Sequence, residues 1–132
     1  MNITLLLDHH LEDRGPYLQA GLCEIGWNDL LILNVLRLRD VSLPDDCPDD
    51  RLWRFVQRER IWLLTSNRNR ADETSLQATI EREGTLHSLP VLTLAHADLL
   101  PQTAYRQRVL QSLVEILVAP ELHYGRGRVF LP

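Results

Sequence analysis

The sequence contains no lysine: all fourteen of its basic residues are arginine. A codon bias of the genome would produce the same absence, so we do not infer nucleic-acid binding from it. The only two cysteines, Cys23 and Cys47, form no CxxC pair and have no histidines at zinc-like spacing. This argues against a disulfide scaffold and fits a reducing compartment.

Long apolar segments are also lacking. No stretch approaches the roughly 18 consecutive apolar residues that a membrane span requires. Residues 1–8 lack the basic segment of a signal peptide, and the apolar run that they contain ends early. We therefore expect a cytoplasmic protein without a membrane segment.

Length and composition are those of an ordinary globular protein. The 132 residues are 45% hydrophobic and 24% charged, which predicts one domain over 1–132. The net charge of −4 gives no general attraction to nucleic acid. Its distribution is uneven, because residues 1–50 hold ten acidic residues and three arginines, a net charge of −7, whereas residues 51–132 carry +3.

Short apolar runs alternate with helical patterns along the chain. This alternation is typical of βα units and predicts an α/β fold of three layers, in which helices flank a mostly parallel sheet of 4–5 strands. We expect strands at 3–7, within 30–38, and at 61–65, 89–94 and 129–131. We expect helices at 16–25, 48–59, 73–83 and 101–118.

Polar residues stand where these strands end. In open parallel sheets, sites form outside the carboxyl ends of the strands. Asp8 ends the first strand, Asn67 follows the third, and Asp49 opens the helix between the second and third. If the first and third strands are neighbours, these groups meet, and Mg²⁺ or Mn²⁺ prefers oxygen ligands of this kind. The alternative is structural: Asp8 caps a turn, and Asp49 is the N-cap of a helix.

Three segments together resemble a family. The sequence LLLD at 5–8, DDRLW at 49–53 and IWLLTSNRN at 61–69 is similar to the small PIN-like proteins, relatives of VapC-type toxins. The resemblance covers about residues 3–100. It implies a central parallel sheet and cleavage of RNA that depends on Mg²⁺ or Mn²⁺.

The resemblance also assigns roles to single residues. Asp8 and Asp49 match acids of the family's metal site, and Asp50 is a further candidate ligand. The family's third acid is replaced here by Asn67 and Asn69, so the acidic site is incomplete. Asn67 would then orient a ligand or a water molecule. His9 and His10 also depart from the family pattern. Asp45 and Asp46 are interpreted as solvated loop charges, which is also the alternative for Asp50.

Arginines lie within and just after the second of these segments, residues 49–53. Arg51, Arg54 and Arg58 recur at i, i+3 and i+7 and predict one basic stripe on the helix, with Arg68 close to the third strand. Beside an acidic site they would contact the phosphates of RNA. The alternative is a solvated helix face with local ion pairs.

Several functions remain open. The first is a PIN-like ribonuclease, the toxin of a toxin–antitoxin pair with an antitoxin-like protein as partner. The second is a catalytically inactive PIN-like module that binds protein or nucleic acid. A flavodoxin-like domain is a third, although no glycine-rich phosphate loop follows the first strand. The triplet at 8–10 also spells the motif of the DHH phosphoesterases, but this chain is too short for that family. Trp53 and Trp62 are expected in the core or in contacts of a homodimer.

Overall fold

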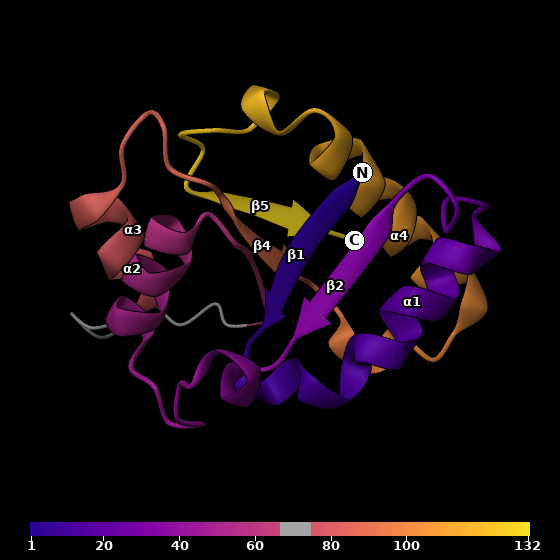
Figure 1. Ribbon diagram of the computed structural model, residues 1–132, viewed down its shortest axis with the longest axis horizontal. Coiled ribbons are helices and arrows are strands. Elements are labelled where there is room, and N and C mark those ends of the chain that lie inside the picture. Colours follow the sequence, from indigo (N-terminus) through magenta and orange to yellow (C-terminus); the bar gives the residue numbers. More distant parts are fainter. Residues whose placement is uncertain (67–74) are drawn as a thin grey trace.

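Five parallel strands form one central sheet in the part of the chain that the computed structural model describes, residues 1–66 and 75–132 (Figure 1). Their spatial order is β2-β1-β3-β4-β5. The strands are β1 (Asn2–Leu7), β2 (Ile32–Leu36), β3 (Trp62–Thr65), β4 (Val91–Leu94) and β5 (Arg128–Leu131). The expected α/β fold with a parallel sheet and flanking helices is confirmed. Its strand order is that of flavodoxin-like sheets, which by itself indicates no function.

Helices cover both faces of the sheet (Figure 1). The α-helices are α1 (Gly15–Glu24), α2 (Asp49–Glu59), α3 (Leu76–Glu83) and α4 (Thr103–Val118). Short 3₁₀-helices are η1 (His9–Arg14), η2 (Leu38–Val41), η3 (Ala97–Leu99) and η4 (Pro120–Leu122). The sequence periodicity did not predict η1 or η2, because a 3₁₀-helix of four to six residues is too short to show a repeating apolar pattern.

The sheet separates two apolar cores. Leu5 and Leu7 of β1 pack with residues of α1 and α4, whereas Leu6 packs with residues of α2 and α3. All three leucines are fully buried. Successive side chains of a strand point to opposite faces, so a strand covered on both sides needs a continuous apolar run. The same reason explains the fully buried strands β3 and β4, and Trp53 and Trp62 lie in the core as expected.

The last connection has the opposite hand to the one before it. Both β3–α3–β4 and β4–α4–β5 step outward in the same direction across the sheet. However, α3 packs on the face covered by α2, while α4 packs on the face covered by α1. The connection between two parallel strands of one sheet is normally right-handed. Two connections that step in the same direction but pass over opposite faces have opposite hands, so only one of these two follows that rule. Nothing in the apolar pattern of the sequence indicates this choice of face.

No helix in residues 1–66 or 75–132 combines the length and the apolar character needed to cross a bilayer.

Candidate functional site

The candidate site lies where the direction of the strand order reverses. The chain passes from β1 outward to β2 and then returns across the sheet to β3 on the other side of β1. The carboxyl ends of β1 and β3 are adjacent, with Leu7 paired to Leu64. The backbone N–H of Asp8 continues this pairing by donating to the Leu64 carbonyl at 3.0 Å. Crevices at such reversals are the usual ligand sites of open α/β sheets.

Asp8 is held in one orientation at this edge. Its Oδ2 accepts a hydrogen bond from the Thr65 hydroxyl at 2.8 Å, and its Oδ1 accepts one from the backbone N–H of His9 at 2.6 Å. The structural role expected for Asp8 is therefore present, since it is the N-cap of η1. An ionised carboxylate has about four acceptor positions, so lone pairs remain on both oxygens for a ligand.

Asp49 reaches the same place from another element. It is the first residue of α2, but the N-cap position is occupied by Pro48, so the interpretation of Asp49 as an N-cap is wrong. Proline at this position cannot cap with its side chain, and no side-chain cap hydrogen bond is present. Its Oδ2 accepts from the backbone N–H of Leu76, at the start of α3, at 3.3 Å.

One surface cavity brings these groups together. Its volume is about 440 Å³, and its described lining is rich in residue types that bind metals. The lining residues are Asp8, His9, His10, Asp45, Cys47, Asp49 and Ser66. The structure thus brings Asp8 and Asp49 to one edge, as the sequence predicts. Asn67 and Arg68 lie outside the described residues.

Asp50 behaves differently from its neighbour. Its Oδ1 accepts from the backbone N–H of Arg51 at 2.8 Å, and its Oδ2 lies 3.6 Å from Arg54 Nη1. It is not among the described residues that line the cavity. The contacts of Asp50 are thus with its own helix, and its role as a ligand beside Asp8 stays a prediction. Adjacent residues of a helix project about 100° apart, so the side chains of Asp49 and Asp50 point in different directions.

The arginine stripe is present but partly neutralised. Arg51, Arg54 and Arg58 line a second cavity of about 420 Å³ beside η2. Arg54 donates two hydrogen bonds to the carboxylate of Glu83, at 2.9 and 2.7 Å. The hydrogen bonds from Arg54 lower the pKa of Glu83 to about 2. The nucleic-acid role expected for Arg54 therefore competes with a strong ion pair inside the protein.

Arg58 is also engaged. Its side chain contacts Glu59 at 3.2 Å and lies over the ring of Phe55, 5.5 Å from the centroid. Of the stripe, Arg51 has the side chain most available to an external phosphate. The local ion pairs expected as the alternative to phosphate binding are thus seen at two of the three arginines.

The cysteine in the site is not an activated nucleophile. Burial raises the pKa of the Cys47 thiol, which favours the neutral form over the reactive thiolate. The Sγ atom lies 3.7 Å from the Pro48 carbonyl, consistent with a weak donor S–H.

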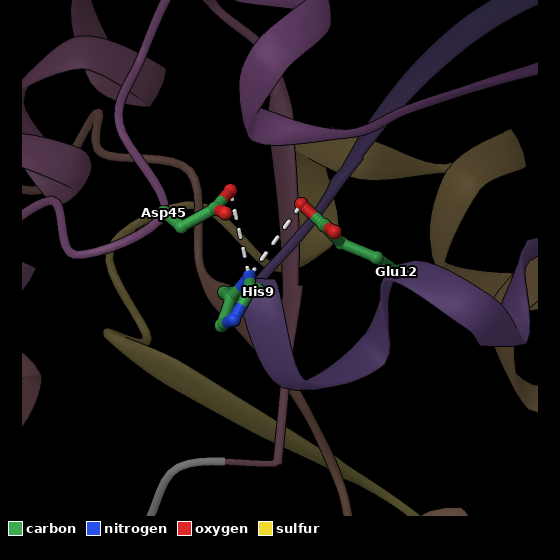
Figure 2. A group of neighbouring side chains, drawn as sticks. All are labelled: His9, Glu12 and Asp45. Atoms are coloured by element: carbon green, nitrogen blue, oxygen red, sulfur yellow. Dashed lines mark ion pairs between the residues drawn. The ribbon is translucent and has the colours of Figure 1, made fainter.

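A second group of ligand-type side chains was missed from the sequence. His9 Nδ1 lies 3.5 Å from Asp45 Oδ1 and 3.7 Å from Glu12 Oε1 (Figure 2). Asp45 was interpreted as a solvated loop charge, and His9 only as a departure from a family pattern. The available signal was the spacing of His9 and Glu12, because residues at i and i+3 of a 3₁₀-helix lie above one another. The position of Asp45 carried no such signal, since it comes from a loop of irregular structure.

Comparison with protein-family models, curated proteins and solved structures gave no match. The site is therefore interpreted from its geometry.

Proposed function

We propose that this protein is a PIN-like, metal-dependent ribonuclease-type protein with an incomplete acidic site. The observation that supports this function is the convergence of Asp8 and Asp49 on one cavity at the carboxyl ends of β1 and β3. Two carboxylates from segments about forty residues apart in sequence meet where open parallel sheets place their ligands. The resemblance of three sequence segments to PIN-like proteins points to the same two residues.

The donor set fits a hard divalent cation. Asp8 and Asp49 would hold Mg²⁺ or Mn²⁺ through carboxylate oxygens, the ligands that these ions prefer. Bound there, the ion would lower the pKa of a water molecule and offset the charge of a phosphodiester. The Thr65 hydroxyl and the His9 N–H already fix the Asp8 carboxylate, so little side-chain freedom is lost on binding.

The RNA would approach over the start of α2. Arg51, two residues after Asp49 in α2, and Arg68 would contact backbone phosphates, and Asn67 would orient a water molecule or a ligand. The contribution of Arg54 would be smaller because Glu83 holds its guanidinium. Because the interactions are mainly with phosphates, binding should weaken as salt concentration rises.

The test is cleavage of RNA by purified protein. A fluorescent single-stranded RNA should be degraded with Mn²⁺ or Mg²⁺ and left intact with a chelator. The cleavage rate of Asp8→Asn should be at least about 100-fold lower, the effect typical of removing one electrostatic group from a catalytic site. Asp29→Asn, which changes an exposed acid in a loop, is the matched control and should retain the activity. Cleavage that persists unchanged in Asp8→Asn would contradict the proposal.

A catalytically inactive PIN-like interaction module is the second candidate. The pairing of Arg54 with Glu83 favours it, because this pair satisfies within the chain a guanidinium that a nuclease would use on RNA. This function predicts RNA or protein binding without cleavage and no calorimetric binding of Mg²⁺. The inactive-module function would be contradicted if titration of Mg²⁺ into wild-type protein released heat and the same titration into Asp8→Asn did not.

The proposed setting is the cytoplasm, away from membranes, with RNA as substrate. An antitoxin-like partner would be encoded beside the gene of this protein. Co-purification of this protein with the product of the neighbouring gene tests the partnership. A homodimer is tested by light scattering of the purified protein, and a monomer at all concentrations would exclude it.

A further inference from the structure

A histidine–carboxylate cluster lies at one side of the cavity and has no role in the function proposed above. It consists of His9 and Glu12 of η1 and Asp45 of the loop between η2 and α2 (Figure 2). His9 and Asp45 also line the cavity that contains Asp8 and Asp49. The side chains come from two elements and point toward one another.

The spacing of the cluster is that of ligands around an ion. One atom from each residue lies within 4.8 Å of the other two, with His9 Nδ1 at 3.5 Å from Asp45 and 3.7 Å from Glu12. Two atoms that bind one ion at about 2.0–2.2 Å are themselves about 3.0–4.4 Å apart. The cluster therefore needs only small side-chain shifts to hold a metal.

Direct hydrogen bonding does not explain this arrangement. Both distances from His9 Nδ1 exceed the range of about 2.7–3.2 Å for N–H···O bonds. A histidine that simply paired with a surface carboxylate would approach it more closely. Here the ring nitrogen lies at ion-pair distance from two carboxylates and beyond the usual hydrogen-bond distance from both.

The burial of Glu12 is an independent observation. Its Oε1 atom is buried and accepts no hydrogen bond among the described residues, and the side chain is only 16% exposed. The other oxygen, Oε2, lies 3.9 Å from Arg39 Nη2, so Oε1 is the atom directed toward His9. A buried acceptor without a donor requires an explanation, and an ion is one that native proteins use.

We propose that His9 Nδ1, Glu12 Oε1 and Asp45 Oδ1 bind one divalent transition-metal ion. Imidazole nitrogen selects ions such as Mn²⁺, Fe²⁺, Co²⁺ or Zn²⁺ over Mg²⁺ and Ca²⁺, which prefer oxygen. The two carboxylates balance the charge of the ion. Three protein ligands leave coordination positions for water, and these face the cavity because His9 and Asp45 line it.

The site shares no ligand with the cation proposed at Asp8 and Asp49, although both open on the same cavity, and it does not depend on RNA cleavage. An ion bound here joins η1 to the loop before α2 and therefore stabilises the folded state by mass action. Both proposals can be tested on the same protein, and either can fail alone.

The experiment is a titration of Zn²⁺ and Co²⁺ into the full chain, purified without a histidine tag and treated with a chelator. Wild type should bind one ion through the cluster, with visible Co²⁺ absorption, in the presence of excess Mg²⁺. His9→Ala should weaken this binding by at least about 10-fold, the smallest effect typical of disturbing a metal site. The matched control is His87→Ala, which removes an exposed imidazole that is not among the lining residues of this cavity and should bind as wild type does.

Further variants separate this site from the acidic pair. Glu12→Gln keeps the size of the side chain and should also weaken Co²⁺ binding, which protects the test if His9→Ala fails to fold by circular dichroism. Asp49→Asn should retain the Co²⁺ signal even if it loses Mg²⁺ binding. The proposal is overturned if wild type binds no Co²⁺ or Zn²⁺ under excess Mg²⁺, or if His9→Ala and Glu12→Gln both bind as tightly as wild type.

Discussion

Asp8 illustrates how a residue of a candidate site can also have a structural role. Its side chain caps η1 through the His9 N–H and also accepts from the buried hydroxyl of Thr65. The position of Asp8 at a strand end could be predicted from the sequence, because a charged residue closes an apolar run. The partner Thr65 could not be assigned, since the pairing of β1 with β3 joins residues 57 positions apart.

The hydroxyl of Thr65 yields a prediction at this scale. Thr65→Val keeps the shape of the side chain and removes the hydrogen bond to Asp8. We expect the free energy of unfolding to fall by about 1.5 kcal/mol, the low end for a hydrogen bond to a charged group, because Asp8 stays partly accessible to water. Urea denaturation measures this change. Thr4→Val, on the same sheet, should have a smaller effect, and equal effects of the two changes would contradict the role given to the Thr65 hydroxyl.

The elements around the site are joined by specific ion pairs. Arg54 of α2 and Glu83 at the end of α3 form a bidentate pair across the face of the sheet that carries both helices. The spacing of the arginines was sufficient to predict a common side of α2. It was not sufficient to predict that an acid from α3 neutralises one of them, because the packing of α3 on α2 is a tertiary contact.

This pair predicts how stability depends on pH. The pKa of Glu83 is about 2 in the folded protein, below the ordinary value of 4.5. A carboxylate with a lowered folded pKa contributes stability that is complete above its unfolded pKa and is lost as pH falls toward the folded pKa. We therefore expect wild type to lose stability as the pH falls from about 4.5 to about 2, measured by thermal melts across this range.

A substitution isolates the contribution of Glu83 to this loss. Glu83→Gln should be less stable than wild type at neutral pH, and its stability should decline less steeply on acidification. The matched control is Glu81→Gln on the exposed side of the same helix, which should keep the wild-type profile. Identical profiles for wild type and Glu83→Gln would show that the pair contributes nothing measurable, as is common for exposed ion pairs.

At the scale of the whole molecule, one sheet supports two cores. Leu63 and Leu64 are neighbours in β3, yet Leu63 packs beneath α2 and α3, and Leu64 packs beneath α1 and α4. Both side chains are nearly or fully buried. Because the same strand belongs to both cores, the loss of either core removes the support of the other.

This shared strand predicts a single cooperative transition. Leu63→Ala and Leu64→Ala should each lower the free energy of unfolding by about 2.7–5 kcal/mol, the cost of a cavity at a buried leucine. In both variants, far-ultraviolet circular dichroism and tryptophan fluorescence should report coincident unfolding curves. Leu86→Ala is the control, since Leu86 is 83% exposed, and it should have little effect. Separate transitions in either core variant would mean that the two cores unfold independently.

The sequence by itself determined the local structure and the chemical character of the site. Apolar runs and helical spacing depend on near neighbours, so the five strands and four α-helices of the described chain could be predicted to within a few residues. An acid at the end of a strand and an acid at the start of a helix were sufficient to predict that Asp8 and Asp49 lie at one edge, because the carboxyl ends of parallel strands coincide.

Only the tertiary structure decided which distant groups meet. Four features depend on contacts between residues far apart in sequence. They are the strand order, the face of the sheet on which α4 packs, the pairing of Arg54 with Glu83 and the contact of Asp45 with His9. Such contacts depend on the path of irregular loops and on the choice between two faces of a sheet. Neither the loop paths nor the choice of face leaves a periodic pattern in the sequence. Both are therefore determined only when the two cores pack.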